Sequence, residues 1–404
     1  MAEKINVPEI RFTGFVDPWE QRKLGEFGSV AMCKRIYKEQ TSEQGDVPFF
    51  KIGTFGTNPD AFISNELFEY FKRTYPYPTP GTLLISAAGS IGRVVEYQGE
   101  KAYFQDSNIV WLEHDHRLND MFLKPLYSQI EWGLEGSTIK RLYNKDLLSA
   151  EVTIPGSGEQ KEIGRFFAKL DDLITLHQRK FEKLVQLKKS MLDKMFPKPG
   201  ERFPEIRFAG FTDPWEQRKL GNCGTTYGGL TGKTKEDFGH GNARFIPYTN
   251  VFDNPLTDTK RLESVEIDSS QNQVVYGDVF FTVSSETPDE VGMSSVWLSD
   301  QEDVYLNSFC FGYRQDSTFD PHYLAYMLRS SSVRSNLTLL AQGISRFNIS
   351  KNKVMELSVP VPSVVEQKQL GQYFTKLDNL ITLHQRKLEL LRNTKKSLLD
   401  RMFV

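Results

Sequence analysis

The chain has 404 residues, 39% of them hydrophobic and 12% aromatic, which is typical of a globular protein with room for two ordinary domains. No apolar run approaches the roughly 18 residues that a membrane-spanning helix needs, so the sequence excludes a membrane span. Lys and Arg number 50 against 52 Asp and Glu, and the net charge of −2 excludes a protein that binds nucleic acid through a broadly basic surface.

The chain begins MAEKINVPEIRF, without the apolar segment of an export signal, and we therefore expect a cytoplasmic protein. Its three cysteines, Cys33, Cys223 and Cys310, lie far apart and form no C-x-x-C pair of the kind found in zinc or redox sites. Since free cysteine is readily buried, we expect all three to be reduced and structural.

Two stretches of the sequence are repeated. The head PEIRFTGFVDPWEQRKLG at 8–25 returns at 204–221 with sixteen of eighteen residues identical, at an offset of 196. The tail EQKEIGRFFAKLDDLITLHQRK, from residue 159, returns from residue 366 as EQKQLGQYFTKLDNLITLHQRK, at an offset of 207. The chain is therefore two modules, each with a constant head, a variable middle and a constant tail, and the second middle is longer by 11 residues.

The two middles keep a weak likeness. PGTLLISAAGSIG at 80–92 resembles 276–292, each with a turn, an apolar strand and a Gly-bounded loop, and 136–155 resembles 343–362. These similarities predict one fold for both middles. Different surfaces on one fold would meet two different targets, whereas the closely similar flanks would meet the same partner twice.

The tails have the period of long helices. Apolar residues recur in steps of four and three, as on the seam of a coiled coil. The central seam residues are Leu170, Ile174, His177, Phe181 and Leu184 in the first tail and Leu377, Ile381, His384, Leu388 and Leu391 in the second. Capping boxes are predicted at Ser157-x-x-Gln160 and Ser363-x-x-Glu366, and PKPG at 197–200 predicts a linker. We expect the two helices to pair antiparallel and set the distance between the middles; the alternative is that each packs on its own domain.

Motifs for catalysis or metal binding are weak. YGGLTGKT at 227–234 has Tyr227 where a phosphate-binding loop needs glycine. Glu159-Gln160-Lys161 and its repeat have an acid-x-Lys spacing known from nucleases, but a capping box explains them better, and His114-Asp115-His116 lacks a third ligand. A histidine on a helix seam is usually structural. The sequence also lacks the Gly-rich turn and Asn-Pro-Pro-aromatic stretch of a methyltransferase, so we predict a non-catalytic chain.

Polar, basic and aromatic residues gather just before each tail helix. Arg and Asn can bond a purine edge at two points, while Lys and Ser suit phosphates, so these clusters predict contact with DNA. The alternative is an exposed polar loop. The predicted DNA-binding residues are Ser137, Thr138, Lys140, Arg141, Tyr143 and Asn144 in the first module and Ser345, Arg346, Asn348, Ser350 and Lys351 in the second. Arg93, in the Gly-bounded loop Ala87–Arg93, is a second candidate, as is loop Ser284–Met293.

Duplicated W-E-Q-R-K-L-G heads and L-I-T-L-H-Q-R-K tails around two variable middles resemble the DNA-specificity subunit of type I restriction-modification systems, over essentially the whole chain. The resemblance implies two target-recognition domains that each read half of a bipartite site in double-stranded DNA, with the helices setting the gap. It implies that two methyltransferase subunits dock on the repeated helices and that restriction subunits join them. S-adenosylmethionine, ATP and Mg²⁺ would then belong to the partners, and the chain itself would need no cofactor and no metal.

The predicted fold class is α+β: two similar globular target-recognition domains separated by two long antiparallel helices that form a coiled coil, with internal pseudo-twofold symmetry. The predicted boundaries are 1–157 for the N-terminal target-recognition domain, 158–200 for the first spacer helix and linker, 201–364 for the C-terminal target-recognition domain and 365–404 for the second spacer helix. Two alternatives stay open: a single-chain DNA methylase or nuclease, and a coiled-coil scaffold that does not touch DNA.

Overall fold

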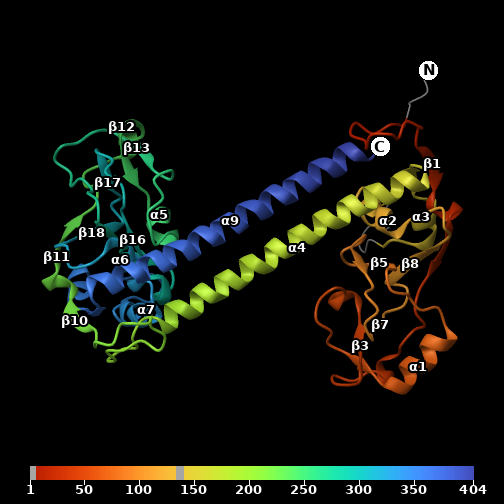
Figure 1. Cartoon of the computed structure of the whole chain (residues 1–404), viewed down its shortest axis with the longest axis horizontal. Coiled ribbons are helices and arrows are strands. Elements are labelled where there is room, and N and C mark those ends of the chain that lie inside the picture. Colours follow the sequence, from red (N-terminus) through yellow and green to blue (C-terminus); the bar gives the residue numbers. More distant parts are fainter. Residues whose placement is uncertain (1–5, 133–140) are drawn as a thin grey trace. The chain divides into compact units, whose positions relative to one another are not determined.

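The computed structural model describes residues 6–132 and 141–404 and divides into two units (Figure 1). The first unit comprises residues 1–177 together with 387–404, and the second comprises 178–386. Each long helix therefore contributes its two ends to different units, and each unit is described by itself below.

The first unit contains nine strands and the start of the first long helix within its described residues. Its elements are β1 (Glu20–Lys23), β2 (Gly28–Ala31), β3 (Val47–Phe50), β4 (Phe62–Ile63), α1 (Asn65–Thr74), β5 (Leu83–Ser86), β6 (Val94–Glu96), β7 (Tyr103–Phe104), β8 (Ile109–His114), α2 (Asp120–Tyr127), α3 (Asn144–Ser149), β9 (Glu151–Ile154) and α4 (Ser157–Lys194).

The second unit repeats this plan with additional elements. They are β10 (Glu216–Lys219), β11 (Gly224–Gly228), β12 (Phe238–Ile246), α5 (Tyr248–Asp253), β13 (Glu263–Val265), β14 (Val279–Thr282), β15 (Ser284–Ser285), β16 (Ser294–Val296), β17 (Val304–Leu306), β18 (Cys310–Gln315), α6 (Pro321–Met327), α7 (Ser331–Leu339), β19 (Phe347–Asn348), α8 (Lys351–Met355), β20 (Ser358–Val361) and α9 (Val364–Met402).

Both units share one sheet topology. The first has the strand orders β2-β8-β5-β6, β4-β3-β7 and β1-β9, and the second has β11-β18-β14-β16, β13-β12-β17 and β10-β20. The parallel pair also recurs, as β3 with β7 and as β12 with β17. The prediction of two similar α+β domains is therefore confirmed.

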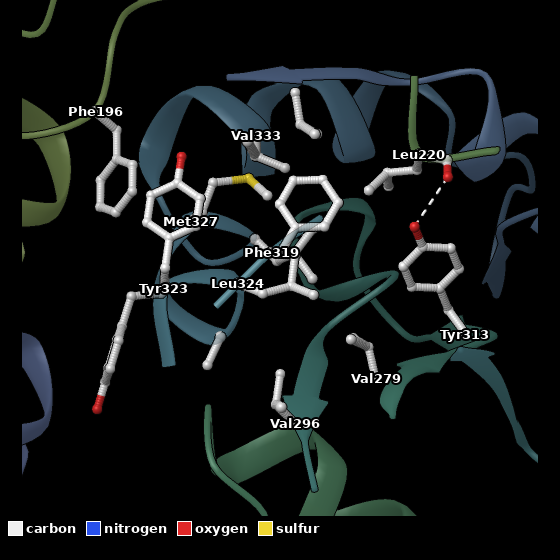
Figure 2. Close-up of a cluster of buried hydrophobic side chains, with 14 of the residues drawn as sticks. Phe196, Leu220, Val279, Val296, Tyr313, Phe319, Tyr323, Leu324, Met327 and Val333 are labelled. Carbon is white, nitrogen blue, oxygen red and sulfur yellow. Dashed lines mark hydrogen bonds between the residues drawn. The ribbon is translucent and has the colours of Figure 1, made fainter. Parts of the chain in front are cut away.

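The central strands are those that the sequence predicted from apolar runs after a glycine turn. All four residues of β5 are buried, as are all four of β14. Gly81 and Gly277 precede them with φ of +96° and +86°, a region that favours glycine. In the second unit β14 lies in a core with residues of α6 and α7, where the Tyr313 hydroxyl donates to the Leu220 carbonyl at 2.9 Å (Figure 2).

A buried ion pair fastens each head to the start of a long helix. In the first unit, the Arg11 guanidinium contacts both Glu159 carboxylate oxygens at 2.6 and 2.7 Å, and the Trp19 indole N–H donates to the same carboxylate at 3.2 Å. In the second unit Arg207 and Trp215 hold Glu366 in the same way, with Arg207 at 2.7 and 2.8 Å. The constant heads and tails therefore include both halves of one structural joint.

The capping boxes correctly predicted where both helices begin and the role of the Ser363 hydroxyl, but the roles they predicted for the Gln160 and Glu366 side chains were wrong. Gln160 accepts from the Asn119 backbone N–H at 3.0 Å, and Glu366 is occupied by Arg207, so neither side chain turns back to cap its helix. Ser363 does accept from the Glu366 N–H, at 3.4 Å. The prediction failed for Gln160 and Glu366 because their competing partners, Asn119 and Arg207, are distant in sequence.

The long helices pack antiparallel within each unit. In the first, the ring centroids of Phe167 in α4 and Phe403, just past the end of α9, are 6.0 Å apart. Asp171 of α4 forms an ion pair with Lys395 of α9. In the second, Lys188 pairs with Asp378 and Phe196 stacks on Phe374 at 5.7 Å. The start of each helix also packs on its own domain, since Ile163, Phe167 and Leu170 belong to the core of the first unit. Both expected arrangements are therefore present in part.

The residues at the end of each long helix are equivalent. Met195 and Phe196 are buried in the core of the second unit, where the ring centroids of Phe196 and Trp215 are 6.2 Å apart. Met402 is buried in the core of the first unit, where the ring centroids of Phe403 and Trp19 are 6.0 Å apart. Each unit thus includes a Met-Phe pair from the end of the other module's helix.

Candidate nucleic-acid interface

Ser137, Thr138 and Lys140, three of the predicted DNA-binding residues, lie outside the described residues. The rest of their cluster comes directly after them in the chain. Arg141 donates to the Ser107 carbonyl at 2.9 Å, with its guanidinium 6.0 Å from the centre of the exposed Tyr143 ring. Asn144 is the first residue of α3. The described part of the cluster therefore presents a cation beside an aromatic face.

This cluster is held next to the loop that follows β5. The Leu142 N–H donates to the Ala87 carbonyl at 2.9 Å, and Arg93, at the end of the loop, donates to the Gly56 carbonyl at 3.2 Å. Gly92 has a φ of +79°, and a Cβ there would lie 2.4 Å from the Trp132 indole nitrogen. The geometry therefore requires glycine at this position. The two candidate segments of the first module are brought together, as a single reading surface requires.

The second cluster lies in the equivalent place. Asn348 pairs with Ser284 in the short sheet of β15 and β19, and the Ile349 N–H donates to the Val283 carbonyl at 2.9 Å. Ser350 occupies the N-cap position of α8, and Lys351 is its first residue. Both modules thus tie their cluster to the loop after the central strand.

These bonds confirm the correspondence between the modules that the sequence predicts. The bond from Leu142 to Ala87 matches that from Ile349 to Val283, so Arg141 corresponds to Asn348, as the alignment of 136–155 with 343–362 also places it. The loop between the matched ends also differs, with six residues at 87–92 and ten at 283–292. The two modules therefore present different side chains at the same site.

Beside the second cluster lies a hollow of about 780 Å³, which we call the β15 hollow. It is lined by Tyr248, Thr249, Phe252, Ser284, Ser285, Glu286, Glu290, Phe309, Ser345 and Arg346. Arg346 donates to the Ser284 hydroxyl at 3.2 Å, and the Tyr248 and Phe252 rings stack with centroids 5.9 Å apart. Sequence reasoning found Ser345, Arg346 and the loop but missed the three aromatic residues of the lining, Tyr248, Phe252 and Phe309, because they lie outside these segments in the sequence.

The predicted seam residues of the long helices face inward to different degrees. Leu170, Leu377 and Leu388 are buried. The part-buried members are Ile174, His177, Phe181, Leu184, Ile381, His384 and Leu391. None of the ten is among the exposed side chains.

Sequence reasoning missed a second apolar set on the outer faces of these helices. Leu173 and Leu176 are 46% exposed in the first unit, and their repeats Leu380 and Leu383 are 43% and 45% exposed in the second. The repeat itself was the available signal, because identity at exposed positions has no explanation in the packing of either core.

Residues of the weak catalytic and metal-binding motifs have structural partners. Lys233 of the near phosphate-binding loop pairs with Asp268 at 2.9 Å. His114 contacts the Asp120 carboxylate at 2.9 Å, which raises the pKa of the histidine. Across residues 6–132 and 141–404, no group of three or more His, Cys, Asp or Glu side chains is arranged to hold a metal ion.

The state of the cysteines and the hydropathy of the helices also bear on the sequence predictions. Cys33, Cys223 and Cys310 are free and buried, as predicted, and burial raises the pKa of Cys33 and Cys310 to about 12. Among the helices in the described parts of the chain, none is both long and apolar enough to cross a bilayer.

Comparison with known proteins gives a consistent result. The profile of the type I restriction modification DNA specificity domain matches the chain twice, over residues 16–186 and 212–393. A putative type I restriction enzyme specificity subunit of Haemophilus influenzae is 51% identical over 153 residues, covering 37% of this chain and 40% of that protein. The MjaVIII specificity subunit of Methanocaldococcus jannaschii is 22% identical over 79% of this chain and 75% of its own length.

A solved structure supports the fold. The type I restriction-modification S subunit of M. genitalium matches 98% of this chain and 99% of that one, with a TM-score of 0.59 at 15% identity. The two profile matches cover most of the sequence, one in each module. The chain belongs to the family of type I restriction-modification DNA-specificity subunits.

Proposed function

We propose that each domain of this chain reads one half of a bipartite site in double-stranded DNA. The observation that carries the proposal is that one site occurs in both domains with different side chains. Both domains have the same sheet topology and the same anchoring hydrogen bond, Leu142 to Ala87 and Ile349 to Val283, but the loop after the central strand has six residues in one and ten in the other. Readers of two different half-sites need a common frame and different contacts. Residues 1–157 and 201–364 are the proposed reading domains, and the long helices set the gap between the halves.

Charge limits how the isolated chain binds DNA. Residues 25–155 contain 13 basic residues (Lys and Arg) and 17 acidic residues (Asp and Glu). Residues 222–362 contain 11 basic and 17 acidic residues, so both middles are acidic. Phosphate contacts provide most of the affinity for duplex DNA and require basic side chains. We therefore assign much of this positive charge to the partner subunits, and we expect the isolated chain to bind DNA weakly at 0.15 M salt.

Two copies of one methyltransferase subunit are the proposed partners, joined by restriction subunits in the complete complex. Leu173 and Leu176 repeat as Leu380 and Leu383, and all four are about half exposed. An exposed apolar pair that is repeated exactly once is what a protein binding twice would contact. Seam residues such as Ile174 and Ile381 would then support the docking face from within.

The chain itself is proposed to catalyse nothing and to act in the cytoplasm. S-adenosylmethionine, ATP and Mg²⁺ are assigned to the partner subunits, and no cofactor is assigned here. Incubating the pure chain with DNA, S-adenosylmethionine and Mg²⁺ tests this, because any methylation or cleavage would support the single-chain enzyme instead.

The deciding experiment is co-expression with the methyltransferase subunit of the same locus in a host without its own system. Methylated bases in the host genome are then mapped. We expect a split motif that requires this chain, and we expect exchange of residues 25–155 for the middle of another family member to change one half only. Methylation that ignores the exchange would favour a scaffold without DNA contact.

A further inference from the structure

The β15 hollow combines a cation and an acid that serve no evident structural need. Arg346 makes one hydrogen bond, to the neutral Ser284 hydroxyl, and no ion pair with a carboxylate among the described residues. By contrast, Arg314 pairs with buried Asp278 and Arg207 with buried Glu366. A guanidinium has five N–H donors, so Arg346 retains most of its hydrogen-bonding capacity.

Glu286 is the acid of this hollow. It is exposed and makes no hydrogen bond or ion pair within residues 6–132 and 141–404. The neighbouring Glu290 differs, because its carboxylate accepts from the Ser285 and Thr287 hydroxyls at 3.0 and 2.9 Å. An ionised carboxylate only accepts hydrogen bonds, so Glu286 is suited to a ligand with an amino group.

The two carboxylates beside Arg346 argue against a phosphate ligand in this hollow. Glu286 and Glu290 line the same hollow as Arg346 and would repel a phosphate anion. A base edge in the major groove has no net charge, and there the two side chains have distinct complements. Arginine bonds both acceptors of guanine, O6 and N7, whereas a carboxylate accepts from the N4 amino group of cytosine.

The hollow is also held in shape. The Tyr248 hydroxyl donates to the Ser284 carbonyl at 2.7 Å, which anchors α5 to β15, and β15 pairs with β19 just after Arg346. Phe309, 60% exposed, adds an apolar wall. Such a wall excludes water from a hydrogen bond and so increases the cost of a wrong base.

We propose that the β15 hollow reads a G·C base pair, with Arg346 bonding guanine and Glu286 bonding its cytosine. This proposal rests on the proposed function and gives the second reading domain its base specificity. The first domain has no equivalent acid, because its loop at 87–92 reads AAGSIG. The two half-sites should therefore differ at this position.

The test uses the complete chain, co-expressed with its methyltransferase subunit and read out by the mapped methylation motif. Exchange of residues 222–362 identifies the half-site of the second domain. We expect Arg346→Gln and Glu286→Gln to relax the same position of that half-site, each lowering the preference for G·C by roughly tenfold or more. Arg346→Lys keeps the charge and can still bond O6 and N7 of guanine, so it should retain more of the preference than Arg346→Gln.

Matched controls lie in the same unit. Arg244 also bonds a serine hydroxyl, that of Ser264, and Glu263 is exposed; neither lines the hollow. Arg244→Gln and Glu263→Gln should leave the motif unchanged. An unchanged motif in Arg346→Gln, or methylation that weakens equally at every sequence, would overturn the base-pair assignment. Absence of any motif with the wild-type chain would instead overturn the proposed function.

Discussion

Arg11 and Glu159 face each other through two contacts, 2.6 Å from Nε to Oε1 and 2.7 Å from Nη2 to Oε2, although 148 residues separate them in the chain. The Glu159 side chain is only 2% exposed and that of Arg11 13%. Removing one member of a buried pair leaves an uncompensated charge in a medium of low polarity. The joint between head and helix is therefore sensitive to a change of a single charge.

Glu159→Gln should destabilise the first unit by about 3 kcal/mol, because Gln keeps the shape of the side chain but leaves Arg11 without a counter-charge. Chemical denaturation followed by tryptophan fluorescence measures the free energy of unfolding, with Trp19 as a reporter of this joint. Glu162→Gln is the control: its exposed pair with Arg165 contributes less than about 1 kcal/mol. Equal losses for both variants would contradict a special role for the joint.

Phe196→Ala should destabilise the second unit by about 3–5 kcal/mol, because it opens a cavity among Trp215, Tyr323 and Phe374. The equivalent Phe403→Ala should cost the first unit somewhat less, since Phe403 is only partly buried. Differential scanning calorimetry resolves the two units if they melt separately. Val404→Ala, next to Phe403 and exposed, should change the free energy of unfolding by less than about 0.5 kcal/mol.

The His114 contact predicts a pH dependence confined to the first unit. Contact with Asp120 raises the pKa of His114, so its stabilisation is fully present below the ordinary histidine pKa of about 6.5 and is lost as the pH rises through the higher folded value. The sheet register places neutral Gln315 at the equivalent position of the second unit.

His114→Gln tests this dependence. The free energy of unfolding of wild type minus that of the variant should be larger at pH 6 than at pH 8, by less than about 1 kcal/mol because Asp120 is 56% exposed. A difference that grows with rising pH would have the wrong sign and would exclude the contact as its cause.

The outer leucines predict the stoichiometry of the complex. Leu173→Glu with Leu176→Glu should lower the number of bound methyltransferase subunits from two to one, because charge replaces an exposed apolar contact in one unit only. Leu380→Glu with Leu383→Glu should do the same, and all four changes should abolish binding. Native mass spectrometry counts the subunits.

Leu339→Glu is the matched control for the leucine variants. Leu339 is 81% exposed but lies outside the repeated segments, so binding should be unaffected. Two bound subunits in the fourfold variant would show that the docking face lies elsewhere.

Much of the fold could be predicted from local pattern. Steps of four and three residues predicted both long helices, and the apolar runs before Ser86 and Thr282 predicted the central strands. These signals are local because each reports how one element buries one face. The role of Glu159 could not be predicted this way, since its partner Arg11 is brought near by the pairing of β1 with β9.

The candidate site was predicted only in part for the same reason. Arg346 and Ser345 stood out by residue type, but their setting depends on Tyr248 from α5 and on Phe309 ahead of β18. Likewise, periodicity identified Leu170 as a seam residue, whereas the exposure of Leu173 depends on what packs around the helix. Three residues of the first cluster, Ser137, Thr138 and Lys140, lie outside the described residues, and their contact with DNA stays a prediction.

The paired strands β1 and β9, together with the Arg11–Glu159 joint, fasten the entrance and exit of the first middle to each other, and β10, β20 and the Arg207–Glu366 joint do so for the second. A segment whose two ends are tied at one place can lengthen or change without displacing the next element of the chain. The second middle is 11 residues longer than the first, yet its joint keeps the same contacts to within about 0.1 Å. The surface of each middle can therefore change while the long helix that follows it still starts from the same position.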